Sequence, residues 1–184
     1  MDGARCPRGF TLVELLVVLA VLGILLGAAL PGFEQIGEAS RMRSAVQHLL
    51  LDVMFTRNQA IKRNVPAILC PSRHAAGGER SCEGAYRDGW LVFADLDHDR
   101  ELDPNEPLLR LAAALPDSLR VTNRAATRTA DERIAYLPDG TSRRNLTLMI
   151  CSQLRPELES RALVLNRVGR PRVARGWGEC PPSG

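Results

Sequence analysis

The sequence predicts an α+β fold: a long N-terminal helix, first hydrophobic and then amphipathic, packs on a C-terminal antiparallel β-sheet domain. An almost unbroken apolar run covers 10–30, and apolar residues then recur at spacings of three and four to about residue 63. Beyond Pro66, short apolar segments alternate with turn residues, which is typical of strands. One long helix laid against antiparallel sheet is a stable two-layer arrangement.

The run at 10–30 has the length of a membrane-spanning helix. Its 21 residues would extend about 31 Å as a helix, enough for the bilayer core. Arg5 and Arg8 precede the run, and Glu34 and Glu38 are the first charges after it. This asymmetry predicts that the N-terminus stays in the cytoplasm while the rest of the chain is exported.

Glu14 interrupts the apolar run. A carboxylate in hydrocarbon is costly and predicts a functional site with a partner. Cleavage after Gly9 would create such a partner, the new α-amino group of Phe10 on a neighbouring subunit. Two alternatives, an ordinary secretory signal cleaved near 27–29 and a generic single-span anchor, do not explain Glu14.

The segment Gly9-Phe10-Thr11-Leu12-Val13-Glu14 resembles the prepilin peptidase site of type IV pilins and type II secretion pseudopilins. The resemblance implies that prepilin peptidase removes the leader after Gly9 and that Phe10 is then methylated. It also implies that Glu14 sets the register of the subunit among other pilin subunits in a filament. The chain is expected to cross the bacterial inner membrane once and later to become part of the filament.

Four segments follow: a leader at 1–9, a transmembrane and filament-core helix at 10–31, an amphipathic half at 32–64, and a periplasmic β-rich domain at 65–184. The apolar stripe of the amphipathic half includes Met42 and Met54, both expected in the core, and the helix should end before Pro66. The predicted strands are 67–70, 89–94, 108–112, 118–122, 133–137, 146–151, 162–166 and 170–174. The tail from 176 to 184 looks loose.

The C-terminal part resembles the GspH/FimT group of minor pilins and pseudopilins. The resemblance rests on Cys70-Pro71-Ser72 with Cys82, on the Asp-Gly-Trp-Leu-Val-Phe stretch at 88–93, on the Tyr-Leu-Pro-Asp-Gly turn at 136–140, and on Cys151. Together with the N-terminal motif, the resemblance covers most of the chain.

Four of the five cysteines lie outside the leader and would reach an oxidising compartment, which favours disulfides. They are Cys70, Cys82, Cys151 and Cys180. Three pairings are possible; local pairing, Cys70–Cys82 and Cys151–Cys180, is preferred because each bond would tie down a loop or the tail. Zinc bound with His74 and His98 is disfavoured, because no CxxC or HxxxH spacing supports it.

An acidic segment has the spacing of a calcium loop. Oxygen ligands stand at positions 1, 3, 5, 9 and 12: Asp95, Asp97, Asp99, Asp103 and Glu106. However, Arg100 occupies the position where such loops need glycine, and the preceding segment is a predicted strand. A calcium site and a solvated hairpin loop whose aspartates bind local backbone groups both remain open. No other cofactor is expected.

Five arginines and no acid lie between 161 and 175, although the whole chain has a net charge of only +3. Pro171 cannot donate to a ladder, so this strand should lie at a sheet edge with Arg170 and Arg172 on one face. Arg167 and Arg175 add positive charge, as do Arg143 and Arg144 of an earlier turn. The alternative to a binding surface is a basic hairpin whose arginines are only solvated. Trp177 is expected to pack on the sheet.

Gly169-Arg170-Pro171-Arg172 is similar to the GRxR motif of FimT-type minor pilins, which bind DNA during natural transformation. The resemblance implies that Arg170 and Arg172 contact the DNA backbone without sequence preference. The preferred function is therefore a minor pilin of a type IV pilus that assists assembly and binds DNA. A GspH-like pseudopilin of type II secretion that does not bind DNA is the alternative, and a calcium-dependent adhesive tip module is a third.

An enzyme is not expected. His48, His74 and His98 have no visible Ser/Cys–Asp partnership, and no glycine-rich loop could cradle a phosphate. We therefore predict no small-molecule substrate.

Overall fold

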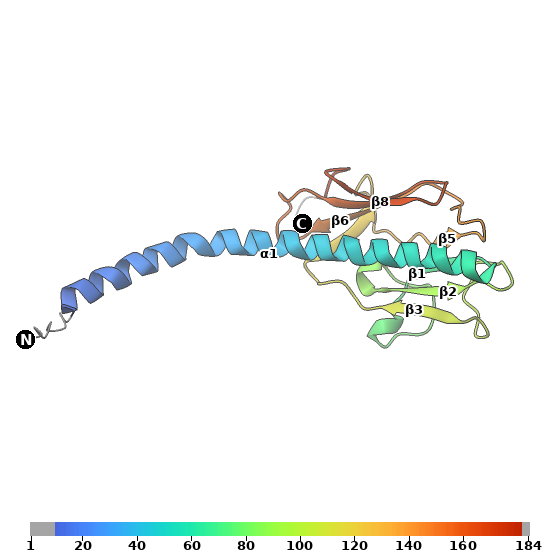
Figure 1. Cartoon of the computed structure of the whole chain (residues 1–184), viewed down its shortest axis with the longest axis horizontal. Coiled ribbons are helices and arrows are strands. Elements are labelled where there is room, and N and C mark those ends of the chain that lie inside the picture. Colours follow the sequence, from blue (N-terminus) through green and yellow to red (C-terminus); the bar gives the residue numbers. More distant parts are fainter. Residues whose placement is uncertain (1–9, 182–184) are drawn as a thin grey trace, which may run out of the picture. The chain divides into compact units, whose positions relative to one another are not determined.

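The computed structural model describes residues 10–181, except for the side chains at 28–32. This part of the chain contains one α-helix and two four-stranded sheets whose neighbouring strands are all antiparallel. The α+β prediction is confirmed (Figure 1). The chain divides after Gly37 into two compact units, of which the second, Glu38–Gly184, holds both sheets.

Helix α1 runs from Leu12 to Arg63. At its start the Thr11 hydroxyl accepts the Glu14 N–H at 3.2 Å, as an N-cap does. At its end Asn64 adopts a left-handed conformation (φ 55°), and Pro66 follows, so the predicted end of the helix is confirmed.

In the first unit the large apolar side chains between Leu12 and Leu26 are exposed, and so is Glu14. The predicted leader and the predicted cleavage site after Gly9 lie outside the described residues. We expected a membrane span at 10–30. Among the described residues, no helix is both long enough and apolar enough to cross a membrane.

The eight predicted strands are all present, with ends within one residue of those expected. The first sheet has the order β3-β2-β1-β5, and the second has the order β4-β6-β7-β8. Their bounds are β1 (Ala67–Pro71), β2 (Trp90–Ala94), β3 (Leu108–Ala112), β4 (Leu119–Asn123), β5 (Ile134–Tyr136), β6 (Leu146–Ser152), β7 (Arg161–Leu165) and β8 (Pro171–Arg175). Two short 3₁₀ turns, His74–Ala76 and Tyr86–Asp88, lie between β1 and β2.

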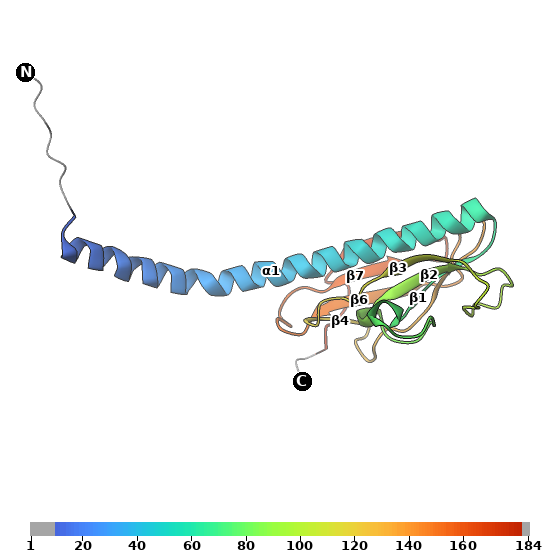
Figure 2. The same cartoon turned by 90° about the horizontal axis from the view of Figure 1, so that it is seen from below.

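Within the second unit, one face of α1 covers both sheets (Figure 2). Helix residues at spacings of three and four are buried, among them Met42, Val46, Leu49 and Val53. They share one core with inward-facing residues of the two sheets, including Leu69, Trp90, Val92, Leu148, Ile150 and Leu163. The prediction for Met54 is wrong: its side chain is 47% exposed, because it falls outside this buried face.

A disulfide lies at the outer face of each sheet. Alternate residues of β1 and β2, such as Ile68 and Phe93, form a second buried cluster, and those of β6 and β7 form a third. Cys70–Cys82 lies in the second cluster and Cys151–Cys180 in the third, so the structure has the preferred pairing. The tail is not loose as far as Pro181, because Cys180 fastens it to β6.

The buried face of α1 also carries two carboxylates, one directed to each sheet. Asp52 is fully buried; it accepts the indole N–H of Trp90 (β2) at 2.8 Å and a guanidinium N–H of Arg110 (β3) at 2.5 Å. Glu38 is 2% exposed and accepts the Ser152 hydroxyl, at the end of β6, at 2.8 Å. An apolar stripe alone could not predict these contacts.

Replacing Asp52 with alanine should destabilise the protein by about 1–3 kcal/mol, because the buried Trp90 N–H loses its acceptor. Urea unfolding of the full chain in mild detergent, followed by circular dichroism, measures this change. Asp117→Ala is the control; its side chain is fully exposed, and a change within about 0.5 kcal/mol is expected. Equal destabilisation of both variants would contradict the assigned role of Asp52.

Candidate nucleic-acid interface

The loop between β7 and β8 is a tight turn that only glycine can complete at position 169. Gly169 has a φ of +80°, and its N–H donates to the Asn166 carbonyl at 2.9 Å. A Cβ atom at this position would lie 2.1 Å from the Gly140 carbonyl oxygen. The Asn166 side chain also accepts the Arg170 N–H at 2.9 Å, so the backbone on both sides of the glycine is fixed.

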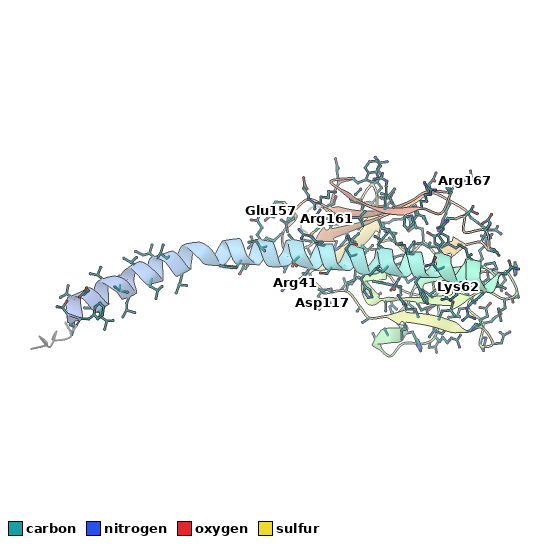
Figure 3. The ribbon with its side chains drawn as sticks, in the orientation of Figure 1. Arg41, Lys62, Asp117, Glu157, Arg161 and Arg167 are labelled. Carbon is teal, nitrogen blue, oxygen red and sulfur yellow. A yellow bond between two sulfur atoms is a disulfide. The ribbon has the colours of Figure 1, made fainter. Side chains whose placement is uncertain are left out.

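A second turn, which contains Gly140, lies against the turn at Gly169. The buried Tyr136 donates its hydroxyl to the Gly169 carbonyl at 3.2 Å, and burial raises the pKa of Tyr136, which keeps the hydroxyl a donor. Arg57 of α1 donates to the Gly140 carbonyl at 2.8 Å. The 166–170 turn is thereby tied through Gly140 to the C-terminal part of α1, and Figure 3 shows Arg167 and Lys62 at the same end of this unit.

The arginines of the hairpin are spread along its length. β8 is an edge strand, as Pro171 predicted, but it begins at Pro171, so Arg170 belongs to the turn and not to the strand. Arg167 and Arg170 are exposed at the turn. Arg175 pairs with Arg161 at the other end of the hairpin, where burial and the charge of Arg175 lower the pKa of Arg161.

Arg172 lies between these ends and contacts the tail. Its guanidinium carbon is 4.6 Å from the centre of the Trp177 ring, and that of Arg124 is 5.0 Å from the same centre. Both are cation–π contacts. Trp177 has 37% of its surface exposed. Its ring contacts two arginines, and it lies near the sheet because Arg172 belongs to β8. No sequence signal pointed to Arg124, which lies 53 positions before Trp177 in the chain.

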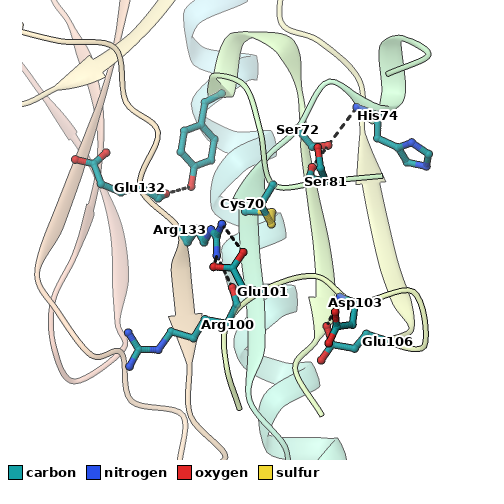
Figure 4. The surroundings of a disulfide bond; sticks show 12 residues. Cys70, Ser72, His74, Ser81, Arg100, Glu101, Asp103, Glu106, Glu132 and Arg133 are labelled. Atoms are coloured by element: carbon teal, nitrogen blue, oxygen red, sulfur yellow. Dashed lines mark hydrogen bonds and ion pairs between the residues drawn. A yellow bond between two sulfur atoms is a disulfide. The ribbon is translucent and has the colours of Figure 1, made fainter. Parts of the chain in front are cut away.

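A second group of arginines surrounds a cavity of about 350 Å³. Its lining includes Arg100, Arg133, Arg143 and Arg144. The loop that carries Arg143 is joined to the hairpin turn, since the Ser142 N–H donates to the Arg167 carbonyl at 3.1 Å and the Arg167 N–H to the Asn145 side chain at 2.9 Å. Arg133 is neutralised by Glu101 at 2.8 Å (Figure 4).

The acidic residues lie in the loop that joins β2 to β3. Asp95, Asp97 and Asp99 each offer a ligand atom within 4.8 Å of the other two. Glu106 is engaged differently: its two carboxylate oxygens accept the N–H groups of Leu96 at 2.6 Å and Asp103 at 3.1 Å. Glu106 therefore braces the loop from within.

The family model of the type II transport protein GspH matches residues 45–169, which include every strand up to β7. The chain belongs to the GspH family. A second family model, the prokaryotic N-terminal methylation motif, matches residues 5–30.

One protein similar in sequence to this GspH-family chain is described as pilin-like. Pilin-like protein PilA1 of Thermus thermophilus is 38% identical over 99 residues, and the match covers 54% of this chain and 55% of that protein. The chain thus spans about half the length of this curated relative.

Two solved structures have the same fold. The type IV minor pilin FimU of Pseudomonas aeruginosa matches with a TM-score of 0.56 at 16% identity, over 79% of this chain and 96% of that one. The minor pseudopilin EpsH of the Vibrio cholerae type 2 secretion system matches with a TM-score of 0.50 at 14% identity, over 75% and 97%. The pilin-like fold of this GspH-family chain is therefore established.

Replacing Gly169 with alanine in this GspH-family chain should destabilise it. A left-handed backbone at a residue other than glycine costs about 1–2 kcal/mol. We expect a larger loss here, because the new Cβ would also meet the Gly140 carbonyl. Gly176→Ala is the matched control, because Gly176 also has a positive φ (+56°) but nothing lies within 4 Å of its Cβ position. Thermal unfolding compares the two variants. A control as unstable as Gly169→Ala would show that the contact with Gly140 is unimportant.

Proposed function

We propose that this chain is a minor pilin of a type IV pilus that assists pilus assembly and binds DNA non-specifically through the turn from Gly169 to Arg172. Prepilin peptidase would cleave after Gly9, and Phe10 would be methylated. Before assembly the chain would sit in the bacterial inner membrane in a single pass, with its sheet unit in the periplasm. The match to the methylation motif at 5–30 supports this processing.

The first half of α1 provides the assembly surface in this proposal. Its large side chains between Leu12 and Leu26 are apolar and exposed, and burying them against helices of other pilin subunits would remove them from water. Glu14 lies in the first turn of this helix. In the filament it would meet the methylated amine of a neighbouring Phe10, which would fix the register of the two subunits.

DNA would be bound by the hairpin turn of the sheet unit. The observation that carries this step is a set of exposed arginines on a rigid edge hairpin: Arg167, Arg170 and Arg172. Guanidinium groups suit phosphate oxygens, and a turn fixed by Gly169 loses little freedom on binding. Backbone contacts of this kind are independent of base sequence.

Trp177 extends this surface. Its ring is partly exposed and lies beside Arg172, so an unpaired base could stack on it while the arginine contacts a phosphate. Arg143 and Arg144 lie next to the turn through the Ser142–Arg167 hydrogen bond and would extend the positive track.

Changing Arg170 and Arg172 together to glutamine should weaken binding to duplex DNA and reduce the slope of log affinity against log salt by about 2, because each arginine would neutralise one phosphate. Gel-shift titrations of the full chain in detergent at several salt concentrations measure both quantities.

The matched control changes Arg73 and Arg87 to glutamine, which removes the same charge from the segment between β1 and β2. This control should retain its affinity. Unchanged binding in the Arg170/Arg172 variant, or an equally weakened control, would rule out the turn as the DNA site.

The second candidate function is that of a pseudopilin in type II secretion, which would not bind DNA. It is favoured by the match of residues 45–169 to the GspH model, whose description is a type II transport protein. In this function the apolar half of α1 would pack in a secretion pseudopilus, and the basic turn would be a solvated surface.

Deleting the gene separates the two candidate functions. A minor pilin that binds DNA predicts loss of natural transformation with normal protein secretion. A pseudopilin predicts the reverse, accumulation of secreted proteins in the periplasm with normal DNA uptake. Transformation frequency and culture-supernatant protein, measured in the same deletion strain, decide between them.

A further inference from the structure

We propose that the loop between β2 and β3 is a calcium site in which Asp95, Asp97 and Asp99 supply the ligands. This site is separate from the DNA-binding turn and does not depend on it. The proposal rests on a buried carboxylate oxygen that lacks a partner and on the spacing of the oxygens around it.

Asp95 provides the first observation. Its side chain is only 1% exposed, and its Oδ1 atom is buried with no hydrogen-bond partner in the described part of the chain. A buried carboxylate oxygen without a donor is costly, so native proteins satisfy nearly all such atoms. Asp95 follows directly after β2, and its backbone N–H donates to the Pro66 carbonyl at 2.9 Å, which holds the residue in place.

The spacing of the oxygens provides the second observation. Ligand atoms of Asp95, Asp97 and Asp99 all lie within 4.8 Å of one another. Since calcium binds oxygens at about 2.3–2.6 Å, two ligands of one ion can be at most about 5 Å apart, and this trio meets that limit. Asp95, a buried residue with an unpartnered carboxylate oxygen, is thus grouped with two exposed carboxylates at the separation that one cation requires.

Two arginines from outside the loop contact it: Arg133 pairs with Glu101 at 2.8 Å, and Arg80 donates to the carbonyls of Pro104 and Glu106. Neither contact involves Asp95, Asp97 or Asp99.

The loop is also braced so that the aspartates stay together. The Glu106 carboxylate accepts N–H groups from both sides of the loop, at Leu96 and at Asp103 (Figure 4 shows its contact with Asp103). Glu106 is thus a positioning residue, whereas the calcium spacing in the sequence had suggested it as a ligand. Calcium fits better than magnesium, because a loop of carboxylates offers flexible oxygen ligands and not a small octahedral cage.

The test is calorimetric titration of CaCl₂ into the full chain in detergent, after treatment with a chelator. We expect one calcium per chain with a Kd of about 10⁻⁴ to 10⁻³ M, and a higher Tm in calcium. Changing Asp97 and Asp99 together to asparagine should weaken binding by at least about tenfold. Both side chains are exposed, so this variant should still fold.

The control variant changes Asp117 and Asp131 to asparagine, which removes the same charge from exposed positions outside the loop. Calcium binding that persists in this control but disappears in the Asp97/Asp99 variant supports the site. The proposal is overturned if millimolar calcium gives no binding heat, if the Asp97/Asp99 variant binds as the unmodified chain does, or if magnesium binds equally well. It is also overturned if NaCl at equal ionic strength raises the Tm as much as calcium does.

Discussion

In the second unit, one face of α1 packs against both sheets, and the fold of the unit depends on this packing. The apolar residues of this face provide most of the buried surface, but apolar contacts have no direction. Direction comes from two buried carboxylates about four turns apart along the helix. Asp52 binds Trp90 and Arg110 of the first sheet, and Glu38 binds Ser152 of the second. Burial alone would raise the pKa of Glu38, but hydrogen bonds from Arg41 and Ser152 outweigh it and lower the pKa, so the group stays ionised.

Because α1 covers only the inner faces, each sheet needs a second cover on its outer face. Segments from outside the sheets supply it, and each is fastened by a disulfide to a central strand. Cys82 brings the 72–88 segment to β1, and Cys180 brings the tail to β6. Two disulfides of this kind suit a domain that folds in an oxidising compartment. The second disulfide also has a consequence for the surface, because it holds the tail where Trp177 meets Arg172 and Arg124.

The two proposed binding surfaces lie on neighbouring loops and have opposite charge. The 95–107 loop carries the aspartates, and the turns at 141–145 and 166–170 carry the arginines. Arg133 connects them, since it binds Glu101 and the Arg100 carbonyl of the acidic loop while its own carbonyl accepts an N–H of Arg144. Residues of the acidic loop and of the 141–145 turn, among them Asp99, Glu101, Arg143 and Arg144, line the same cavity of about 350 Å³. In the acidic loop and in the hairpin turn, hydrogen bonds fix the backbone of a short segment. The exposed charged side chains of each segment can therefore contact a ligand.

The sequence predicted the helix, the eight strands and the edge position of β8, because periodicity, proline and turn residues act within a few positions of the chain; short motifs predicted the family. It also identified the aspartates of the acidic loop and the glycine of the hairpin turn. The three-dimensional fold alone shows which residues far apart in sequence meet. It directed Asp52 to Trp90 and Arg124 to Trp177, turned the oxygens of Glu106 to backbone N–H groups, and separated Arg175 from the turn. These contacts depend on how the two sheets pack against one helix face, and the spacing of residues along the chain does not predict that packing.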